Sequence, residues 1–264
     1  MLEYALKEDI ALNKAIILVA GMGTRLKPRT DTIHKCLTKV NDIPIIENAL
    51  TCLKSVGVTE VMLVVGYLRD EIKDEIGNEF NGIKIGYVEN SDYATTSTSY
   101  SLKLGLEAIK DYDTLYVLEG DVFFEKKLIK LIQNDVHENK TLVEKYNSLL
   151  DGSFVELKSD GFVKDWTHKS MREEGYVLED KFKTVNIHCF SAEFAKNKLI
   201  PAVIQISDQS HGQEPIENVM RKIVREDNNS IFGLEVGDLK WFEIDDEHDL
   251  MIAEEIFKDY KIEI

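Results

Sequence analysis

Apolar runs of strand length alternate with segments of helical period along the first 120 residues of the chain. The run at 15–20 has almost no polar interruption, as expected for a strand whose two faces are both covered. The alternation predicts strands at 15–20, 61–65, 83–88 and 114–118, and helices at 44–55, 68–76 and 97–109. Elements in this order form a largely parallel sheet with helices on both faces.

The pattern changes beyond residue 140. Short stretches joined by turns predict strands at 141–145, 152–157, 162–165 and 184–190, as in an antiparallel extension of the sheet. Helical spacing returns at 192–203, 215–225 and 246–259. Since neither a repeat nor a linker interrupts the chain, we expect a single α/β domain over 14–264, Rossmann-like and three-layered, with a mostly parallel mixed sheet. Residues 1–13 are expected to form a short helical extension.

The chain is strongly acidic, with 48 Asp and Glu against 32 Lys and Arg and a formal net charge of -16. This balance argues against a nucleic-acid or anionic-membrane binder, because such proteins present a basic face. The cysteines, Cys36, Cys52 and Cys189, are odd in number and lack CxxC spacing, which indicates reduced thiols. Because it lacks a long apolar run and a signal-peptide pattern, the chain is expected in the cytoplasm. The sequence leaves the oligomeric state open, with a homodimer as one option.

Positive charge concentrates just after the first predicted strand. In the stretch 21–39 a single acid, Asp31, accompanies a set of basic residues: Arg25, Lys27, Arg29, Lys35 and Lys39. They follow the turn Gly21-Met22-Gly23, and backbone N–H groups of such a turn bind phosphate. A dinucleotide-binding turn needs a small residue where this chain has Leu26, and a P-loop needs a Gly-Lys-Ser/Thr that does not follow here.

The same stretch resembles the signature of the nucleotidyltransferases that activate phosphorylated small molecules, A-G-x-G-T-R-hydrophobic-x-P-x-T followed by a lysine. The matching positions are Ala20, Gly21, Gly23, Thr24, Arg25, Leu26, Pro28, Thr30 and Lys35. His34 departs from the pattern, because the family usually has proline there. The resemblance implies a GT-A-like fold and catalytic roles for Arg25 and Lys35, which would clamp the triphosphate and bridge the reacting phosphoryl groups. It also implies a nucleotide site formed by Ala20, Gly21, Gly23, Thr24 and Arg25. Tyr93 and Ser99 belong to a segment that resembles the family's N-x-x-Y…S-L segment, which implies that they line the nucleotide base.

Carboxylates follow the fourth predicted strand and recur near the end of the chain. Asp121 ends the segment Leu118-Glu119-Gly120-Asp121, and Asp245 lies in a W-x-E-I-D segment that resembles the closing segment of small-alcohol cytidylyltransferases. The resemblance implies that Asp121 and Asp245 hold Mg²⁺, which prefers one or two carboxylates together with phosphate oxygens. Two alternatives remain: Asp121 as the cap of a helix at 122–132, and Glu243 as the second metal ligand in place of Asp245.

The segments 119–125 and 183–191 resemble the branch of the family that handles phosphocholine or 2-aminoethylphosphonate. An ammonium head group needs carboxylates or an aromatic face, which Asp165 and Trp166 could supply. Asn186 is the third candidate acceptor-binding residue, because it is polar and interrupts an apolar strand. The leading hypothesis is a Mg²⁺-dependent cytidylyltransferase that joins CTP to one of these small anionic acceptors and releases pyrophosphate. A sugar-1-phosphate nucleotidyltransferase using UTP or dTTP is the alternative, and a non-catalytic nucleotide-sensing regulator is a hypothesis of another class.

Overall fold

A computed structural model of the protein describes residues 11–262. The predicted helical extension at 1–13 therefore lies almost entirely outside the described residues. Within the described part, Asn13 already belongs to the first strand, β1 (Asn13–Val19), so it is not helical. No helix of residues 11–262 is long and apolar enough to cross a membrane.

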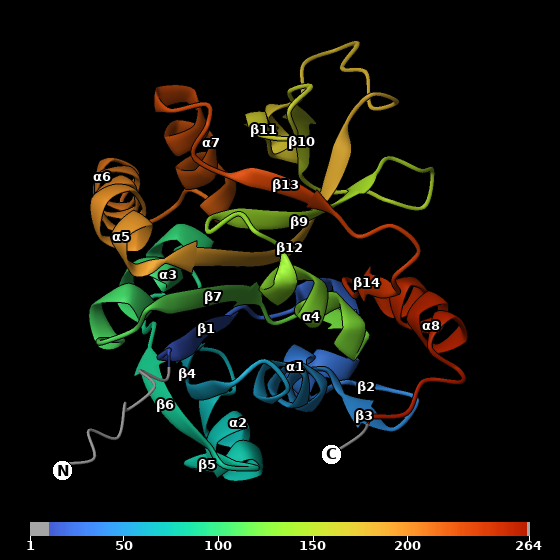
Figure 1. Ribbon diagram of the computed structural model, residues 1–264. Helices are drawn as coiled ribbons and strands as arrows, with labels where there is room; N and C mark the ends of the chain where they lie inside the picture. The colour runs from blue at the N-terminus through green and yellow to red at the C-terminus, as the bar shows by residue number, and fades with distance from the viewer. Residues whose placement is uncertain (1–10, 263–264) are drawn as a thin grey trace, which may run out of the picture.

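The centre of the molecule is a ten-stranded mixed sheet (Figure 1). Its parallel part has β1 in the middle, flanked by β4 (Val58–Val65) and β7 (Thr114–Glu119). Next to β4 lie β6 (Ile83–Glu89), which is parallel, and the short antiparallel edge strand β5 (Glu79–Phe80). The predicted parallel core is confirmed, with boundaries that differ by a few residues.

The antiparallel extension begins at β7, which pairs with β12 (Phe182–Ser191). Beyond β12 lie β9 (Lys140–Lys145), β10 (Phe154–Leu157) and β11 (Val163–Thr167). One further strand, β13 (Phe232–Glu235), pairs in parallel with β9 and is absent from the sequence prediction. The result is one mixed sheet, as expected for an α/β domain with an antiparallel extension.

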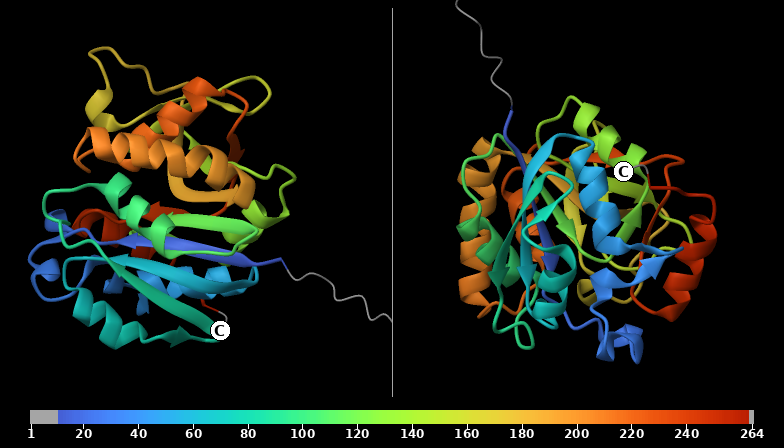
Figure 2. Two further views of the ribbon diagram at one scale, coloured as in Figure 1. Left: turned by 90° about the vertical axis from the view of Figure 1, so that its left-hand side faces the viewer. Right: turned by 90° about the horizontal axis from the view of Figure 1, so that it is seen from below.

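Helices cover both faces of this sheet (Figure 2). Neighbouring residues of β1 separate the two layers: Ile17 packs in one apolar cluster and Ile16 in the other, and both are fully buried. The Ile17 cluster includes residues of α1 (Ile45–Lys54), α2 (Arg69–Ile76) and α4 (Lys126–Asn134). The Ile16 cluster includes residues of α3 (Thr98–Ala108), α6 (Ile200–Gln209) and α7 (Ile216–Glu226). The three-layer architecture is therefore confirmed.

A short ribbon beside the main sheet corrects the expectation for residues 122–132. Residues Val122–Phe124 form β8, which pairs with β14 (Trp241–Glu243), and α4 starts only at Lys126 with Glu125 as its cap. Asp121 is therefore not a helix cap, and that alternative is wrong. The ribbon packs against α8 (Glu247–Ile256), which Asp246 caps through a reciprocal pair of hydrogen bonds with Asp249.

The helix predicted at 192–203 is also longer and less regular than expected. It runs through α5 (Ala192–Phe194), a π-helical turn (Ala195–Leu199) and α6. The short 3-10 turns Thr24–Leu26, Arg29–Asp31 and Lys35–Leu37 shape the segment after β1. This segment, the carboxyl end of β7 and the end of β14 meet at one place, which is where ligands bind in open α/β sheets.

Candidate active site

The glycine turn after β1 packs directly on the loop that carries Lys35. Gly23 has a left-handed backbone with φ of 58°, and a Cβ there would lie 3.1 Å from the Lys35 Cβ and 3.2 Å from the Thr30 Cγ2. The Thr30 hydroxyl donates a hydrogen bond to the Gly23 carbonyl at 2.9 Å, and Leu26 is fully buried below. Glycine is therefore required at position 23 both by backbone conformation and by close approach.

Lys35 lies at the centre of the candidate site. Its Nζ is 2.8 Å from Oδ2 of Asp121 and 2.8 Å from Oδ1 of Asp245. The same Asp245 oxygen lies 2.8 Å from Nη2 of Arg25. Burial alone would lower the pKa of Lys35, but the two aspartates outweigh it and hold that pKa above its ordinary value. Burial would likewise raise the pKa of Asp245, yet Lys35 and Arg25 hold it below its ordinary value, so Lys35 and Asp245 stay charged at neutral pH.

Gly120 brings Asp121 close to the glycine turn. A Cβ at position 120 would lie 2.2 Å from Cγ1 of Val19 and 2.9 Å from the carbonyl oxygen of Leu18. The end of β7 can therefore approach the end of β1 only without a side chain at this position. This approach brings the Asp121 carboxylate next to the Lys35 ammonium.

His34, which departs from the family pattern, joins the lysine loop to the glycine turn. It is buried, and its Nδ1 accepts a hydrogen bond from the Cys36 backbone N–H at 3.1 Å. The Nε2 nitrogen lies 3.2 Å from the Gly21 carbonyl oxygen, so the neutral ring with a proton on Nε2 satisfies both contacts. Burial lowers the pKa of His34 to about 4, which keeps this form at neutral pH.

A cavity of about 330 Å³ opens over these residues, and we call it the glycine-turn cavity. Its walls include all of the predicted nucleotide-binding residues except Ser99, namely Ala20, Gly21, Gly23, Thr24, Arg25 and Tyr93. Ser99 is fully buried in α3, and its backbone N–H bonds to the Glu214 carbonyl, so the structure does not bring it to the cavity. Residues at the start of α3 line the wall instead: Ser97, Thr98 and Ser101.

Three carboxylates lie together beside Lys35. Each of Glu119, Asp121 and Glu243 offers an oxygen within 4.8 Å of the others. Oδ1 of Asp121 is buried and has no hydrogen-bond partner among the described residues. Burial raises the pKa of Glu119 well above its ordinary range, and repulsion from Glu217, Asp121 and Glu243 adds to it. Oxygen ligands, excess negative charge and an unpartnered oxygen fit a divalent cation such as Mg²⁺.

This arrangement separates the two predicted metal ligands. Asp121 belongs to the carboxylate group, whereas Asp245 forms ion pairs with Lys35 and Arg25 and lies outside that group. Glu243, which the sequence offered only as an alternative ligand, belongs to the same carboxylate group as Asp121. The position of Asp245 as a metal ligand stays a prediction.

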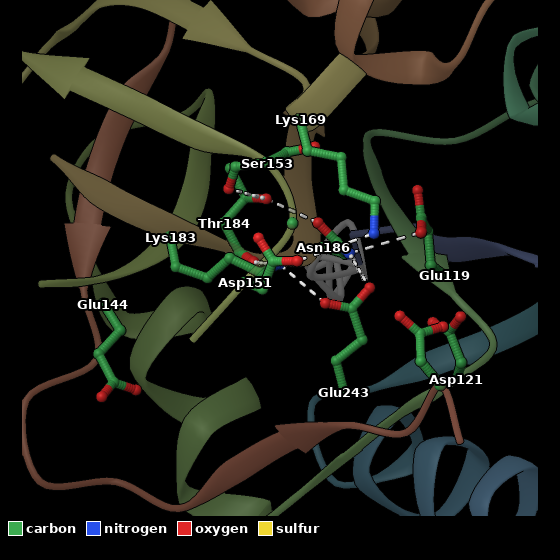
Figure 3. A network of polar contacts seen from close by, with 12 residues as sticks. Glu119, Asp121, Glu144, Asp151, Ser153, Lys169, Lys183, Thr184, Asn186 and Glu243 are labelled. Atoms are coloured by element: carbon green, nitrogen blue, oxygen red, sulfur yellow. Dashed lines mark hydrogen bonds and ion pairs between the residues drawn. The ribbon is translucent and has the colours of Figure 1, made fainter. Parts of the chain in front are cut away.

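A second cavity, of about 190 Å³, adjoins the first, and we call it the inner cavity. The two share wall residues, including Arg25, Glu119, Asp121 and Asp245. The inner cavity adds polar side chains from several elements: Ser153, His168, Lys169, Lys183, Asn186, Glu217 and Glu243. Figure 3 shows several of these side chains pointing toward a common centre.

Asn186, a predicted acceptor-binding residue, lies in the wall of the inner cavity. Its amide donates to Oε1 of Glu243 at 3.2 Å and to Oε2 of Glu119 at 3.4 Å, and its carbonyl accepts from the Thr184 hydroxyl at 2.8 Å (Figure 3). The residue has a left-handed backbone, with φ of 62°, inside β12. Such strain in a residue other than glycine is typical of functional sites.

The other two predicted acceptor-binding residues lie elsewhere. Asp165 forms ion pairs with Arg221 and Arg225 of α7, and Trp166 is 1% exposed in the apolar cluster below that helix. Neither lines the inner cavity, so the structure does not support an acceptor role for them. They failed as candidates because strand β11 packs against α7, which no local pattern in the sequence reveals.

Lys169, Lys183 and Glu217 also line the inner cavity and are not among the site residues that the sequence predicts. Lys183 is 1% exposed and forms an ion pair with Oε2 of Glu243 at 2.9 Å. A lysine at the start of an apolar strand is the one local signal that pointed to it. Lys169 and Glu217 lie on a short 3-10 turn and on α7, where charged residues are ordinary.

Comparison with known proteins agrees with this geometry. Residues 14–148 match the model of the nucleotidyl transferase family. The chain is 30% identical over 236 residues to a CMP-5'-(3-aminopropyl)phosphonate synthase of Streptomyces rubellomurinus, which covers 89% of this chain and 37% of that protein. It is 32% identical over 188 residues to a 2-aminoethylphosphonate cytidylyltransferase of Lancefieldella rimae, which covers 69% of this chain and 68% of that one.

The fold agrees as well. The structure of the CTP:phosphocholine cytidylyltransferase from Streptococcus pneumoniae superimposes with a TM-score of 0.71 at 25% identity, covering 94% of this chain and all of that one (100%). The matched stretches span between 34% and 56% of the length of five curated relatives. The glycine turn, the charged centre and these similarities together establish that the chain belongs to the nucleotidyl transferase family.

Proposed function

We propose that the protein is a Mg²⁺-dependent cytidylyltransferase that transfers CMP from CTP to a small phospho- or phosphono-compound and releases pyrophosphate. The observation that carries the proposal is the convergence of Arg25 and Lys35 on Asp121 and Asp245, each contact being 2.8 Å. This centre lies where the glycine-turn cavity and the inner cavity share their walls. A nucleotide and a second anion can therefore approach each other at these cations.

The reaction needs no general base in this scheme. An oxygen of the acceptor, already anionic, forms a bond to the α-phosphorus of CTP. The bond from that phosphorus to the oxygen bridging to the β-phosphorus breaks, and its electron pair leaves with pyrophosphate. Two anions repel each other, so Lys35 and Arg25 would bring them together and neutralise charge that develops between them. The high pKa of Lys35 keeps it available as a cation.

Asp121, with Asp245 or Glu243, would hold the magnesium ion. When bound, Mg²⁺ would neutralise charge on the triphosphate and help to fix its orientation. The unpartnered Asp121 oxygen and the excess of carboxylates support this assignment.

We assign the acceptor to the inner cavity. Lys169 reaches its wall from the 3-10 turn after β11 and supplies a cation for a phosphate or phosphonate group, in addition to Arg25. Relatives that act on 2-aminoethylphosphonate or choline phosphate by name support an acceptor of this size and charge. Phosphocholine and 2-aminoethylphosphonate are the acceptors that follow from the sequence analysis.

The experiment is a matrix of nucleotides and acceptors, with pyrophosphate release as the measurement, with and without Mg²⁺. CTP, UTP, dTTP and GTP are each combined with 2-aminoethylphosphonate, phosphocholine and glucose 1-phosphate. We expect release only with CTP, an alkyl phosphonate or phosphate acceptor, and Mg²⁺. Turnover restricted to UTP or dTTP with the sugar phosphate would replace the proposal with the sugar-1-phosphate alternative. CTP binding without release from any pair would favour the regulator.

A further inference from the structure

The inner cavity carries more negative charge than its own cations neutralise. Lys183 forms its ion pair with Glu243. Glu119 and Glu217 also line the cavity, and no lysine or arginine within residues 11–262 forms an ion pair with either of them. Lys183 attracts both carboxylates, but its ion pair is with Glu243, so neither Glu119 nor Glu217 has an ion-pair partner of its own.

These carboxylates are held in place. Glu217 is only 8% exposed, and one of its oxygens accepts a hydrogen bond from the hydroxyl of Ser153, which is itself 3% exposed. Glu119 accepts from the amide of Asn186, whose other partners fix its orientation. A buried carboxylate without a counter-charge is costly, so this wall is suited to a ligand that brings a positive charge.

The walls also discriminate between kinds of cation. A trimethylammonium group is recognised by aromatic faces, and no Trp, Tyr or Phe of the described chain lines the inner cavity. The neighbouring cavity contains Trp241, but the Nζ of Lys183 lies 5.8 Å from the centre of one of its rings and already faces it. A primary ammonium, by contrast, donates N–H hydrogen bonds, and carboxylates such as Glu119 and Glu217 accept them.

The inner cavity offers both signs of charge. Arg25 and Lys169 can bind an anion, whereas Glu217 and Glu119 can bind a cation. An acceptor that carries both an anion and a cation matches this mixed lining. The volume, about 190 Å³, restricts it to a short molecule.

We infer that the acceptor is a short zwitterion, a phosphonate or phosphate monoester that bears a primary ammonium group, and that Glu217 and Glu119 select it by binding the ammonium. This inference rests on the proposed function. It excludes choline phosphate, and phosphonates whose head group is a neutral hydroxyl, as preferred acceptors. Asn186 is then a positioning residue, because it orients Glu119 and Glu243.

The test compares acceptors that differ only at the head group. With CTP and Mg²⁺, kcat/KM is measured for 2-aminoethylphosphonate, for its neutral counterpart 2-hydroxyethylphosphonate, and for phosphocholine beside phosphoethanolamine. We expect the primary amines to be preferred by at least about tenfold in each pair, because unpaired buried carboxylates penalise an acceptor without N–H donors. This comparison uses the wild-type chain, so it does not depend on whether a variant folds.

A variant then assigns the selectivity to a residue. Glu217→Gln should lower kcat/KM for 2-aminoethylphosphonate far more than for 2-hydroxyethylphosphonate, mainly by raising KM, and so reduce the preference by about tenfold. Glu156→Gln removes the same charge from β10 outside the cavity and should leave the preference unchanged.

The outcomes separate the two proposals. If phosphocholine or 2-hydroxyethylphosphonate is turned over as well as or better than its primary-amine counterpart, the inference is overturned and the cytidylyltransferase proposal still stands. So would a folded Glu217→Gln variant with the wild-type preference. If no acceptor supports CTP-dependent pyrophosphate release, the proposed function itself fails.

Discussion

The Nζ of Lys35 lies 2.8 Å from Oδ2 of Asp121, although the lysine belongs to a loop after β1 and the aspartate follows β7. This contact joins the basic and acidic halves of the site. A triphosphate presents the same kind of anionic oxygen as the aspartate, so we expect the ammonium to transfer from carboxylate to phosphate when nucleotide binds.

Replacing Lys35 should remove catalysis while leaving the fold intact. In Lys35→Ala the cation between the two phosphoryl groups is lost, and we expect kcat to fall by about 10²–10³. Lys39→Ala, which removes an exposed lysine of the same segment, is the matched control and should retain wild-type turnover. Rates of pyrophosphate release are compared after circular dichroism has verified folding. A folded Lys35→Ala variant with normal turnover would contradict the assigned role.

The metal assignment predicts a graded response to the loss of single carboxylates. Chelation with EDTA should abolish turnover, and Asp121→Asn and Asp245→Asn should each raise the Mg²⁺ concentration for half-maximal rate by about tenfold or more. Asp238→Asn, at an exposed position, serves as the control. The measurement is a Mg²⁺ titration at saturating CTP. A larger effect of Glu243→Gln than of Asp245→Asn would make Glu243 the second ligand.

Replacing two glycines near the site by alanine should have different effects, one on stability and the other on nucleotide binding. Gly120→Ala places a methyl group against Val19 and the Leu18 carbonyl, so we expect a loss of about 3 kcal/mol in the free energy of unfolding. At Gly21 no atom lies within 4 Å of an added Cβ, and the residue lines the glycine-turn cavity. Gly21→Ala should therefore keep stability within about 0.5 kcal/mol of wild type. Its KM for CTP should rise by about tenfold.

Urea unfolding and CTP saturation curves of both variants provide the check. Full stability of Gly120→Ala would show that β7 can move away from β1. An unchanged KM in Gly21→Ala would mean that the nucleotide does not approach this turn.

A buried histidine makes stability depend on pH. Burial lowers the pKa of His188 on β12 from 6.5 to about 3, so below pH 6.5 the unfolded chain binds a proton that the folded chain does not. Stability is therefore lost as the pH falls, by about 2 kcal/mol between pH 7 and pH 5 from this residue. The free energy of unfolding in urea should fall less over this range in His188→Gln than in wild type. His248→Gln, exposed on α8, should follow wild type, and identical slopes for all three chains would refute the prediction.

Local pattern was sufficient for the parallel core and for the basic half of the site. The apolar run of β1 is buried on both faces, so nearly every residue in it must be apolar, and this leaves a strong signal. Gly23, Arg25 and Lys35 lie within one short segment, and their backbone and charge requirements appear directly as residue types. Asp121 followed from its place at the end of a recognisable strand.

The sequence by itself thus determined the parallel core of the sheet, the glycine turn and the residues that carry positive charge to it. Only the tertiary structure decided which carboxylates meet them, because Asp245 reaches Lys35 across 210 residues of chain and β14 is held by the three-residue strand β8. It also decided that Glu217, rather than Asp165 or Trp166, faces the inner cavity. Such contacts depend on how α7, β11 and β12 pack together, and packing between distant segments leaves no periodic trace in the sequence.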